Sequence, residues 1–380
     1  MRFILFIFLL TTNHKSLIGR EIHSIYQSPN FLGRGNSGLT APSAEDSISY
    51  NPAALAINPL KTEKKIVILS PAFSISNNVE QLEKAGGDDQ ELLNTLKDLV
   101  GDPIYAGLNN FSGYAGESWG LGLISGNSAS ALIFNDFEKG GISTLSLEAY
   151  QNLGIAGAYA YTILDDRLAI GIGPKLVQRT ATIVKLSIAD IDEIQNFKFK
   201  EYQNSGLGFG VDLALSYKFA APNSPHMTLV ISDVGDTSFS GDDSKAPIPS
   251  QNQSIKLGAS LSHSIADFQN HFFLDWHDLL KRTENNSLKN VHLGSTISHP
   301  LGVGLNLGLN QGYFSTGFFY QNPSFRFDLG SYGVETGELI GERASRRYFM
   351  RFMWTIGGEN KAEPANPIEQ NESSTPQGSV

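Results

Sequence analysis

The sequence predicts an all-β protein, a transmembrane antiparallel β-barrel of about 14 strands with a short helical insert. One observation is a two-residue alternation, clearest over residues 207–218, where Leu, Phe, Val and Tyr alternate with Gly, Ala, Ser and charged residues. Successive side chains of a strand point to opposite faces, so one face is large and apolar and the other is small or charged. A soluble sandwich would bury the apolar face, whereas a membrane barrel turns it toward lipid.

The expected strands follow one another along most of the chain. They are residues 64–76, 117–125, 128–137, 143–163, 168–187, 197–219, 226–233, 254–264, 269–279, 288–299, 301–310, 312–321, 324–333 and 346–356. An even number suits a single-chain barrel. Residues 104–114 could form one further strand, but an odd number would place the chain ends on opposite rims, so we interpret them as part of the insert.

The links between these strands favour a barrel over a sandwich. Every second link is short, at 165–167, 221–225, 265–268, 300 and 322–323. The intervening links are longer, at 188–196, 234–253, 281–287 and 334–345, with Gln311-Gly312 as the exception. Short turns on one rim and long loops on the other are typical of bacterial outer-membrane barrels, whose short turns face the periplasm.

Composition excludes several classes of protein. The 380 residues are 41% hydrophobic, yet no stretch approaches the roughly 20 apolar residues of a spanning helix. The 38 Gly, 23 Phe and 13 Tyr suit many short strands. A net charge of -10 argues against nucleic acid as a partner, and the absence of Cys excludes disulfides, thiolate metal sites and a lipoprotein anchor.

The N-terminus resembles an export signal, which we place at residues 1–24. Arg2 precedes the apolar run 3–10, and polar residues follow. Cleavage after Gly19 or after Ser24 is compatible with the sequence, and a buried N-terminal strand is the alternative.

Two further segments depart from the strand pattern. Residues 79–100 carry apolar residues at helical spacing, which predicts two short helices that either cover a barrel mouth or form a surface insertion. Residues 358–380 are polar and rich in Pro, which predicts a disordered tail. The tail is either an inert extension or a docking segment for a periplasmic partner.

Charged residues of the last two strands fall on the polar face. Arg347 and Arg351 share one face of 346–356, and Arg326 and Asp328 lie on the polar face of 324–333. Because a charge facing lipid is costly near the bilayer midplane, we expect all four to point into the lumen as a charge network. Simple structural pairing inside a solvated lumen is the alternative to a ligand site.

Two N-terminal blocks carry a family resemblance. Residues 33–38 (Gly-Arg-Gly-Asn-Ser-Gly) and 44–55, which include Asn51, Pro52 and Ala53, resemble the N-terminal block of FadL-type outer-membrane proteins. The resemblance implies an Asn-Pro-Ala hatch motif in an N-terminal hatch, residues 25–63, that plugs a fourteen-stranded barrel, residues 64–357. Pro52 keeps Asn51 out of the helical region, and the Asn side chain can bond nearby backbone.

The C-terminal blocks are similar to the PorV-like and TraF-like branch of that superfamily. They are residues 275–279, 292–294, 308–312 and 332–348. Two departures stand out: Ala54 replaces the Gly that usually follows Asn-Pro-Ala, and the chain continues beyond its last strand.

The resemblance implies passive uptake of hydrophobic small molecules such as long-chain fatty acids, in the outer membrane of a Gram-negative bacterium. Arg347 and Arg351, with Arg326 and Asp328 beside them, are the residues expected to bind a ligand. The inward residues are mostly Gly, Ala, Ser and Asn, which provide little apolar surface. The alternative is a PorV-like or TraF-like scaffold or shuttle that binds outer-membrane or periplasmic proteins in secretion or conjugative transfer.

Enzyme chemistry is not expected. The sequence has no P-loop, HExxH or G-x-S-x-G motif. Asp275, His277 and Asp278 include two residues on one strand face, but no second His is placed to complete a metal site. We therefore predict no catalytic residues, no metal and no cofactor, and we expect membrane lipid as a partner.

Overall fold

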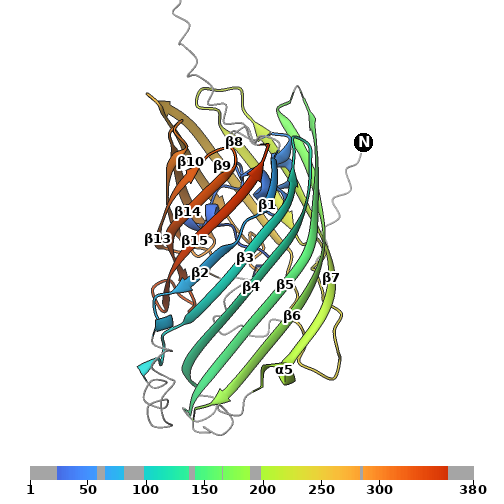
Figure 1. Cartoon of the computed structure of the whole chain (residues 1–380), viewed down its shortest axis with the longest axis vertical. Coiled ribbons are helices and arrows are strands. Elements are labelled where there is room, and N and C mark those ends of the chain that lie inside the picture. The colour runs from blue at the N-terminus through green and yellow to red at the C-terminus, as the bar shows by residue number, and fades with distance from the viewer. Residues whose placement is uncertain are drawn as a thin grey trace, which may run out of the picture.

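The computed structural model describes residues 24–57, 65–80, 98–136, 142–164, 166–188, 198–282 and 286–357, which form one closed antiparallel barrel (Figure 1). The strands are β1 (Lys65–Leu69), β2 (Ala72–Ser76), β3 (Ile104–Ala115), β4 (Trp119–Asp136), β5 (Ile142–Ile163), β6 (Leu168–Ser187), β7 (Gln203–Lys218), β8 (His226–Ser232), β9 (Ser254–Ile265), β10 (Phe268–Trp276), β11 (Val291–Ser298), β12 (Val303–Asn310), β13 (Tyr313–Gln321), β14 (Phe325–Glu335) and β15 (Ala344–Ile356). The helices are α1 (Pro29–Gly33), α2 (Ala44–Tyr50), the 3-10 helix η1 (Pro52–Leu55) and α5 (Phe199–Tyr202).

The barrel closes through its first strand. β1 and β2 both pair with β15 on one side and β3 on the other, so they are two halves of one strand interrupted at Ser70 and Pro71. Pro71 has no N–H to give to a ladder, which suits it to such a break. The described strands therefore occupy fourteen positions around the barrel, and the predicted fold class is confirmed.

Two of the expected strands are wrong in detail. The strands expected at 117–125 and 128–137 are replaced by one continuous strand, β4 (Trp119–Asp136), and residues 104–114 form most of β3 rather than part of an insert. Gly126 suggests a turn in the sequence, but it faces the lumen, where an added Cβ would overlap the Ile25 carbonyl oxygen. The expected total of strands is correct because one strand was split and another omitted.

The outside of the barrel is apolar. Exposed side chains are large and hydrophobic on strand after strand, and they alternate with buried small or polar ones. Examples of the exposed set are Leu121, Tyr159, Phe209, Phe314 and Trp354. Such a belt around a closed set of strands is the surface of a membrane-spanning barrel of the bacterial outer-membrane type.

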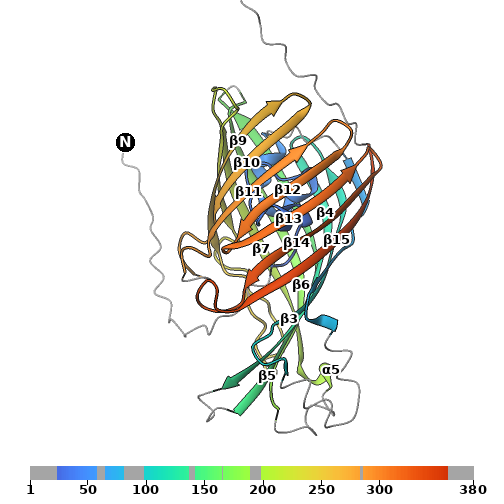
Figure 2. The ribbon, with the colours of Figure 1, turned by 90° about the vertical axis from the view of Figure 1, so that its left-hand side faces the viewer.

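The strands differ greatly in length around the barrel. β4, β5 and β6 have 18, 22 and 20 residues, whereas β11 and β12 have 8 each. Figure 2 shows β3 to β7 extending well beyond the shorter strands at the end opposite the short turns. Gln311 and Gly312 form the short exception at the long-loop rim, with φ of 52° and 87°, as a tight hairpin turn requires.

Several predicted segments lie outside the described residues. These are residues 1–23 of the expected signal, residues 58–63 of the expected hatch, residues 81–97 of the expected insert and the tail 358–380. In the part of the chain that the structure describes, no helix is long and apolar enough to cross a membrane.

Candidate functional site in the barrel lumen

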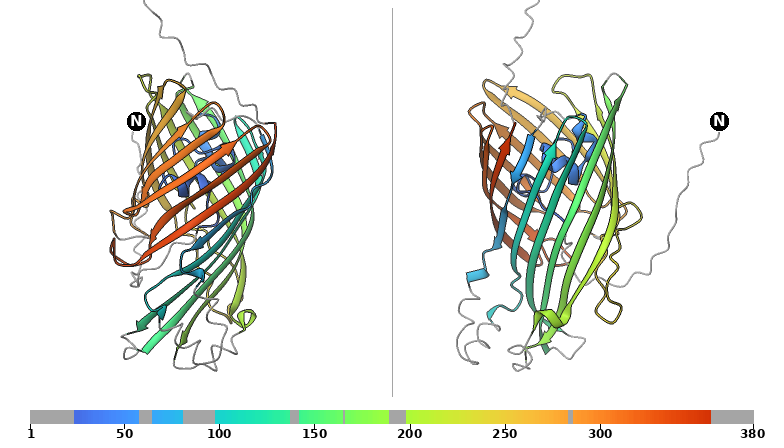
Figure 3. Two further views of the ribbon diagram at one scale, coloured as in Figure 1. Left: turned by 60° about the vertical axis from the view of Figure 1, so that its left-hand side comes forward. Right: turned by 45° about the vertical axis from the view of Figure 1, so that its right-hand side comes forward.

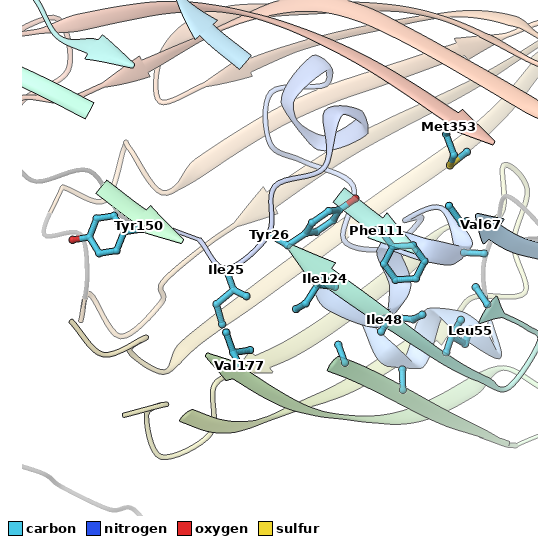
Figure 4. Packing of buried hydrophobic residues seen from close by; sticks show 14 of the residues in the cluster. Ile25, Tyr26, Ile48, Leu55, Val67, Phe111, Ile124, Tyr150, Val177 and Met353 are labelled. Carbon is cyan, nitrogen blue, oxygen red and sulfur yellow. The ribbon is translucent and has the colours of Figure 1, made fainter. Parts of the chain in front are cut away.

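Residues 24–57, here called the inner segment, lie inside the barrel wall. They contain α1, α2 and η1, which Figure 3 shows within the ring of strands from two sides. Figure 4 shows the apolar part of this contact, with side chains of the inner segment facing side chains of the wall. The labelled side chains include Ile25, Tyr26, Ile48 and Leu55 of the segment, and Phe111, Ile124, Val177 and Met353 of β3, β4, β6 and β15.

Local capping explains how so short a segment holds its shape. Ser28 caps α1 by accepting a hydrogen bond from the Asn30 N–H, and Pro29 follows it in the first turn, where a proline is tolerated. Glu45 and Asp46 lie in the first turn of α2, where negative charge is favourable. These local contacts favour the two short helices, and contacts with the wall complete the arrangement.

The Asn-Pro-Ala motif joins the inner segment to the wall. The Asn51 side chain accepts from the Ala53 N–H, which starts η1, and donates to the Leu39 carbonyl at 2.7 Å. The same amide lies 3.0 Å from Thr228 Oγ1 on β8 and 3.2 Å from Ser216 Oγ on β7. The Asn51 side chain thus caps η1, bonds to Leu39 of the same segment, and bonds to β7 and β8 of the wall.

Ala54 shows that this turn does not need Gly at that position. It lies within η1 and is not among the residues with positive φ, so an L side chain is accommodated.

The small inward residues of the wall form the seat of the inner segment. Gly171 of β6 faces η1 so closely that a Cβ would overlap the Ala53 nitrogen and lie 2.5 Å from the Pro52 carbonyl carbon. Gly294 and Gly308 have the same relation to Arg34. These three inward Gly residues therefore mark where a second piece of chain lies against the wall.

A buried ionic cluster connects β14 and β15 to α1. Arg351 donates to Asp328 with an N–O distance of 2.7 Å, and Arg326 donates to the other oxygen of Asp328 at 2.8 Å. Both guanidinium groups also donate to the Asn30 side-chain carbonyl of the inner segment. Three of the four expected members, Arg326, Asp328 and Arg351, therefore form a charge network, and they bond to one another and to the segment.

Arg347, the fourth predicted ligand residue, has other neighbours. Its guanidinium lies over the Tyr105 ring of β3, 3.6 Å from the centroid, and its Nε donates to Ser345 Oγ at 3.2 Å. The side chain is inward and almost fully buried, as the alternation of β15 predicts.

Glu45 provides a second ionic contact between the segment and the wall. Lys65, the first residue of β1, lies 2.6 Å from one oxygen of Glu45, and Arg351 lies 3.9 Å from the other. Burial by itself would raise the pKa of Glu45, but the positive charges of Lys65 and Arg351 outweigh burial and lower the pKa to about 2. Glu45 is therefore ionised throughout the ordinary pH range.

Asp275 of β10 holds the middle of the inner segment, a role that the sequence did not suggest. One of its oxygens accepts from the Gly38 N–H at 2.6 Å and the Leu39 N–H at 2.9 Å. His292 of β11 contacts the Gly35 carbonyl oxygen through Nδ1 at 3.1 Å. The signal that could have found Asp275 is a charged residue on the inward face of a predicted strand.

The β8–β9 loop, residues 233–253, folds back over the open edge of β7. Lys175 of β6 binds both Asp212 of β7 and Asp233 at the start of the loop, at 2.8 and 2.9 Å. Arg179, which is buried, donates to the Pro249 carbonyl and to Gln251 Oε1. The sequence predicts only a long acidic loop here, because no local pattern relates Lys175 and Arg179 of β6 to the β8–β9 loop.

No metal centre is evident among the described residues, where no group of three or more His, Cys, Asp or Glu is arranged to hold an ion. Asp275 and His277 approach within 3.9 Å, but Asp278 accepts from the Arg282 backbone N–H instead.

The barrel is similar in fold to solved structures of outer-membrane channels. A mutant of the monoaromatic hydrocarbon channel TodX, with S2 and S3 deleted, matches over 88% of this chain and 99% of its own, at 10% identity and a TM-score of 0.50. The chain shares the fold of that channel. The Pseudomonas putida toluene transporter TodX matches over 89% and 99% at 10% identity and a TM-score of 0.47. A Pseudomonas aeruginosa FadL homologue matches over 89% and 99% at 9% identity and a TM-score of 0.36.

Sequence comparison gives one local similarity. Residues 116–234 match the family model described as F plasmid transfer operon, TraF, protein. No curated protein matches the chain. The matched residues run from the start of β4 to just beyond β8, and so include the longest strands of the barrel.

Proposed function

We propose that this protein is an outer-membrane channel for the passive uptake of hydrophobic small molecules such as long-chain fatty acids, with the inner segment as its hatch. The observation that carries the proposal is that a separate short segment, rather than the wall's own large side chains, fills this part of the lumen. Wall Gly residues leave room for it, and side chains of the wall bond to its backbone at Gly38 and to its Asn51 side chain. A lumen filled in this way opens when the segment moves, without any change in the barrel.

The energetics of the contacts suit such a movement. Many of the contacts are hydrogen bonds, each worth about 0.5–1.5 kcal/mol net, because water can replace the partner. Burial of a hydrocarbon chain contributes about 0.8 kcal/mol for each methylene. A long acyl chain thus supplies enough binding free energy to compete with the segment for the lumen.

We assign the predicted anchor for a ligand carboxylate to Arg347. A role of Arg351, Arg326 and Asp328 in ligand binding stays a prediction, and our proposal gives these three the task of holding the hatch. Arg347→Ala is expected to weaken binding of a long-chain fatty acid about tenfold or more, because a charge-assisted hydrogen bond is worth about 1.5–3 kcal/mol. Isothermal titration of the purified barrel with oleate measures this.

Arg346→Ala is the matched control for that variant, because Arg346 is the neighbouring arginine on the opposite face of β15 and donates to the Phe314 carbonyl. Equal oleate affinity in the Arg347→Ala variant and the unchanged protein would remove the anchor role.

A designed disulfide tests whether the hatch must move. Leu39 Cβ lies 3.1 Å from the position of a Cβ added at Gly258 of β9, so the two Cβ atoms must separate by a few tenths of an ångström to reach the roughly 3.5–4.5 Å found in disulfides. The added Cβ would also lie 2.8 Å from Asp275 Oδ1, so the reduced double variant is the reference for uptake. The chain has no other Cys, so Leu39→Cys with Gly258→Cys gives one unambiguous cross-link. In proteoliposomes, oxidation is expected to lower uptake of labelled oleate at least tenfold, and reduction is expected to restore it.

Each single Cys variant, treated with the same oxidant, controls for effects of the reagent and of the substitutions. Oleate uptake that is unaffected by the formed cross-link would show that transport does not need displacement of this part of the segment.

A scaffold for other proteins is the second candidate, favoured by the match of residues 116–234 to the TraF family model. Strands β4 to β7 of that range extend beyond the shorter strands of the barrel and would present a surface to a partner (Figure 2). Mass spectrometry of protein gently extracted from its native membrane separates the two candidates. A stoichiometric acyl or hydrocarbon ligand supports uptake, whereas a stable protein partner without ligand supports the scaffold.

A further inference from the structure

One turn of the inner segment is held by two titratable side chains of the wall. Residues 35–39 contain Gly35 and Gly38 at φ of 71° and 111°, a conformation that exposes successive backbone groups to β10 and β11. Asp275 accepts two N–H groups from this turn, and His292 contacts the Gly35 carbonyl oxygen. Because a carbonyl oxygen can only accept, His292 Nδ1 carries the proton and donates it.

The His292 ring packs against a second histidine ring, tilted by 36°. The ring centroids of His277 and His292 are 4.2 Å apart, and His292 is buried. His277 Nε2 is enclosed without a hydrogen-bond partner, 3.9 Å from the Asp275 oxygen that holds Gly38 and Leu39. Two imidazole rings in contact cannot both be charged without mutual repulsion.

The charged groups around the pair and around Asp275 come from three elements. Asp275 and Asp278 lie on or next to β10, Lys256 is on β9, and Arg34 belongs to the inner segment itself. Arg34 is buried and stacked between the Phe31 and Phe273 rings, so its charge is not dispersed into water. Burial lowers the pKa of Arg34 to about 10, so it stays positively charged.

From this arrangement we infer that His277 and His292 form a proton-operated latch, so that acid releases the inner segment from the β9–β11 wall. The inference rests on the proposed hatch. A proton on His292 places a cation in contact with the His277 ring. A proton on His277 draws the Asp275 carboxylate toward a new partner and away from Gly38 and Leu39. Either event weakens the contacts of Asp275 and His292 with the turn at residues 35–39.

The direction of the pH effect follows from linkage. The closed hatch favours neutral rings, whereas an opened hatch lets water solvate them, and a hydrated histidine titrates near pH 6.5. The closed state is therefore at full strength above about pH 6.5 and is weakened as the pH falls below it. For each histidine, the equilibrium shifts toward opening by up to about tenfold per pH unit. Glu45, with a pKa of about 2, stays ionised and does not contribute in this range.

Efflux of arabinose from proteoliposomes tests the latch, because the sugar is uncharged at every pH used. Between pH 7.5 and pH 5, efflux through the full-length protein is expected to rise at least tenfold. The double variant His277→Gln with His292→Asn keeps polar groups near the ring nitrogens but cannot titrate, and its efflux is expected to vary less than twofold. His263→Gln, at an exposed histidine of β9, is the matched control and is expected to retain the rise.

Each outcome is decisive. A flat profile in the unchanged protein, or a rise that persists in the double variant, overturns the latch. Abolition of the acid-induced efflux by the oxidised cross-link of the Leu39→Cys, Gly258→Cys variant supports it, since the path then runs past the hatch. Single variants at each histidine, checked for folding by heat-modified gel mobility, cover the case in which the double variant does not fold.

Uptake of labelled toluene at pH 7.5, measured on the same vesicles, separates the latch from the proposed function. Toluene uptake with pH-independent arabinose efflux contradicts the latch alone. Acid-induced efflux without uptake of toluene or oleate supports the latch and contradicts the proposed transport.

Discussion

Asp328→Ala is expected to detach the inner segment from β14 and β15 while the barrel remains closed. The substitution leaves Arg326 and Arg351 buried with no carboxylate between them, and loss of one partner from a buried ionic cluster costs about 3–5 kcal/mol. The strand ladders do not depend on the Asp328 side chain, so the loss falls on the contacts with Asn30. The population of detached segment should therefore rise by more than a hundredfold.

Trypsin measures this detachment directly. Arg34 is the one Lys or Arg in residues 24–57, and it is only 3% exposed in the docked segment. Cleavage after Arg34 in folded, detergent-solubilised barrel is expected to accelerate at least tenfold in Asp328→Ala. Arabinose efflux from proteoliposomes should increase in parallel.

Two controls define what the cleavage result means. Asp328→Asn keeps an acceptor for one arginine, so its cleavage rate should lie between the two extremes. Asp243→Ala removes an exposed carboxylate from the β8–β9 loop and should leave the rate unchanged. If Asp328→Ala is cleaved as slowly as Asp243→Ala, the ionic cluster does not hold the segment.

The fold could be predicted because its main determinant is local and repeated. Alternation of large apolar with small or polar residues sets the two faces of each strand, and residues 207–218 show it without interruption. The expected strands differ from β3 and β4 where a residue serves a purpose other than setting the two faces of a strand. Gly126 accommodates the inner segment rather than a turn, and the parity of strand number does not show that residues 104–114 form β3, because β1 and β2 share one position in the barrel.

The candidate site could be predicted only in part, for a related reason. The inward direction of Arg347, Arg351, Arg326 and Asp328 follows from strand parity, and the structure confirms it. Asn30, which accepts from Arg326 and Arg351, is separated from Arg351 by 321 positions in the sequence, and no local pattern relates them.

The same limit applies to Asp275, which is 237 positions from Gly38. Contacts between a wall and a segment inside it depend on closure of the whole barrel, which periodicity does not specify. The excess of small inward residues was the signal available in the sequence. In the structure these residues leave room for the inner segment against the wall.

Gly171→Ala is expected to displace η1 from the wall, although it adds one methyl group. The new Cβ would overlap the Ala53 nitrogen and lie 2.5 Å from the Pro52 carbonyl carbon, both of them backbone atoms. Neither can rotate away as a side chain would, and Asn51 fixes the same turn to β7 and β8. Overpacking of this kind costs about 1–3 kcal/mol or more, so cleavage after Arg34 and arabinose efflux should both increase.

Gly173→Ala is the matched control, two positions away on the same face of β6. Its Cβ would have no neighbour closer than 3.5 Å, an ordinary contact distance. Both substitutions replace Gly with the same residue in one strand, so any general effect on strand stability is shared. Heat-modified gel mobility should therefore be equal for the two variants, while cleavage and efflux differ about tenfold. Identical behaviour of the pair in all three measurements would mean that the wall does not hold the segment by close approach at Gly171, and that the polar contacts of Asn51 and Asp275 suffice.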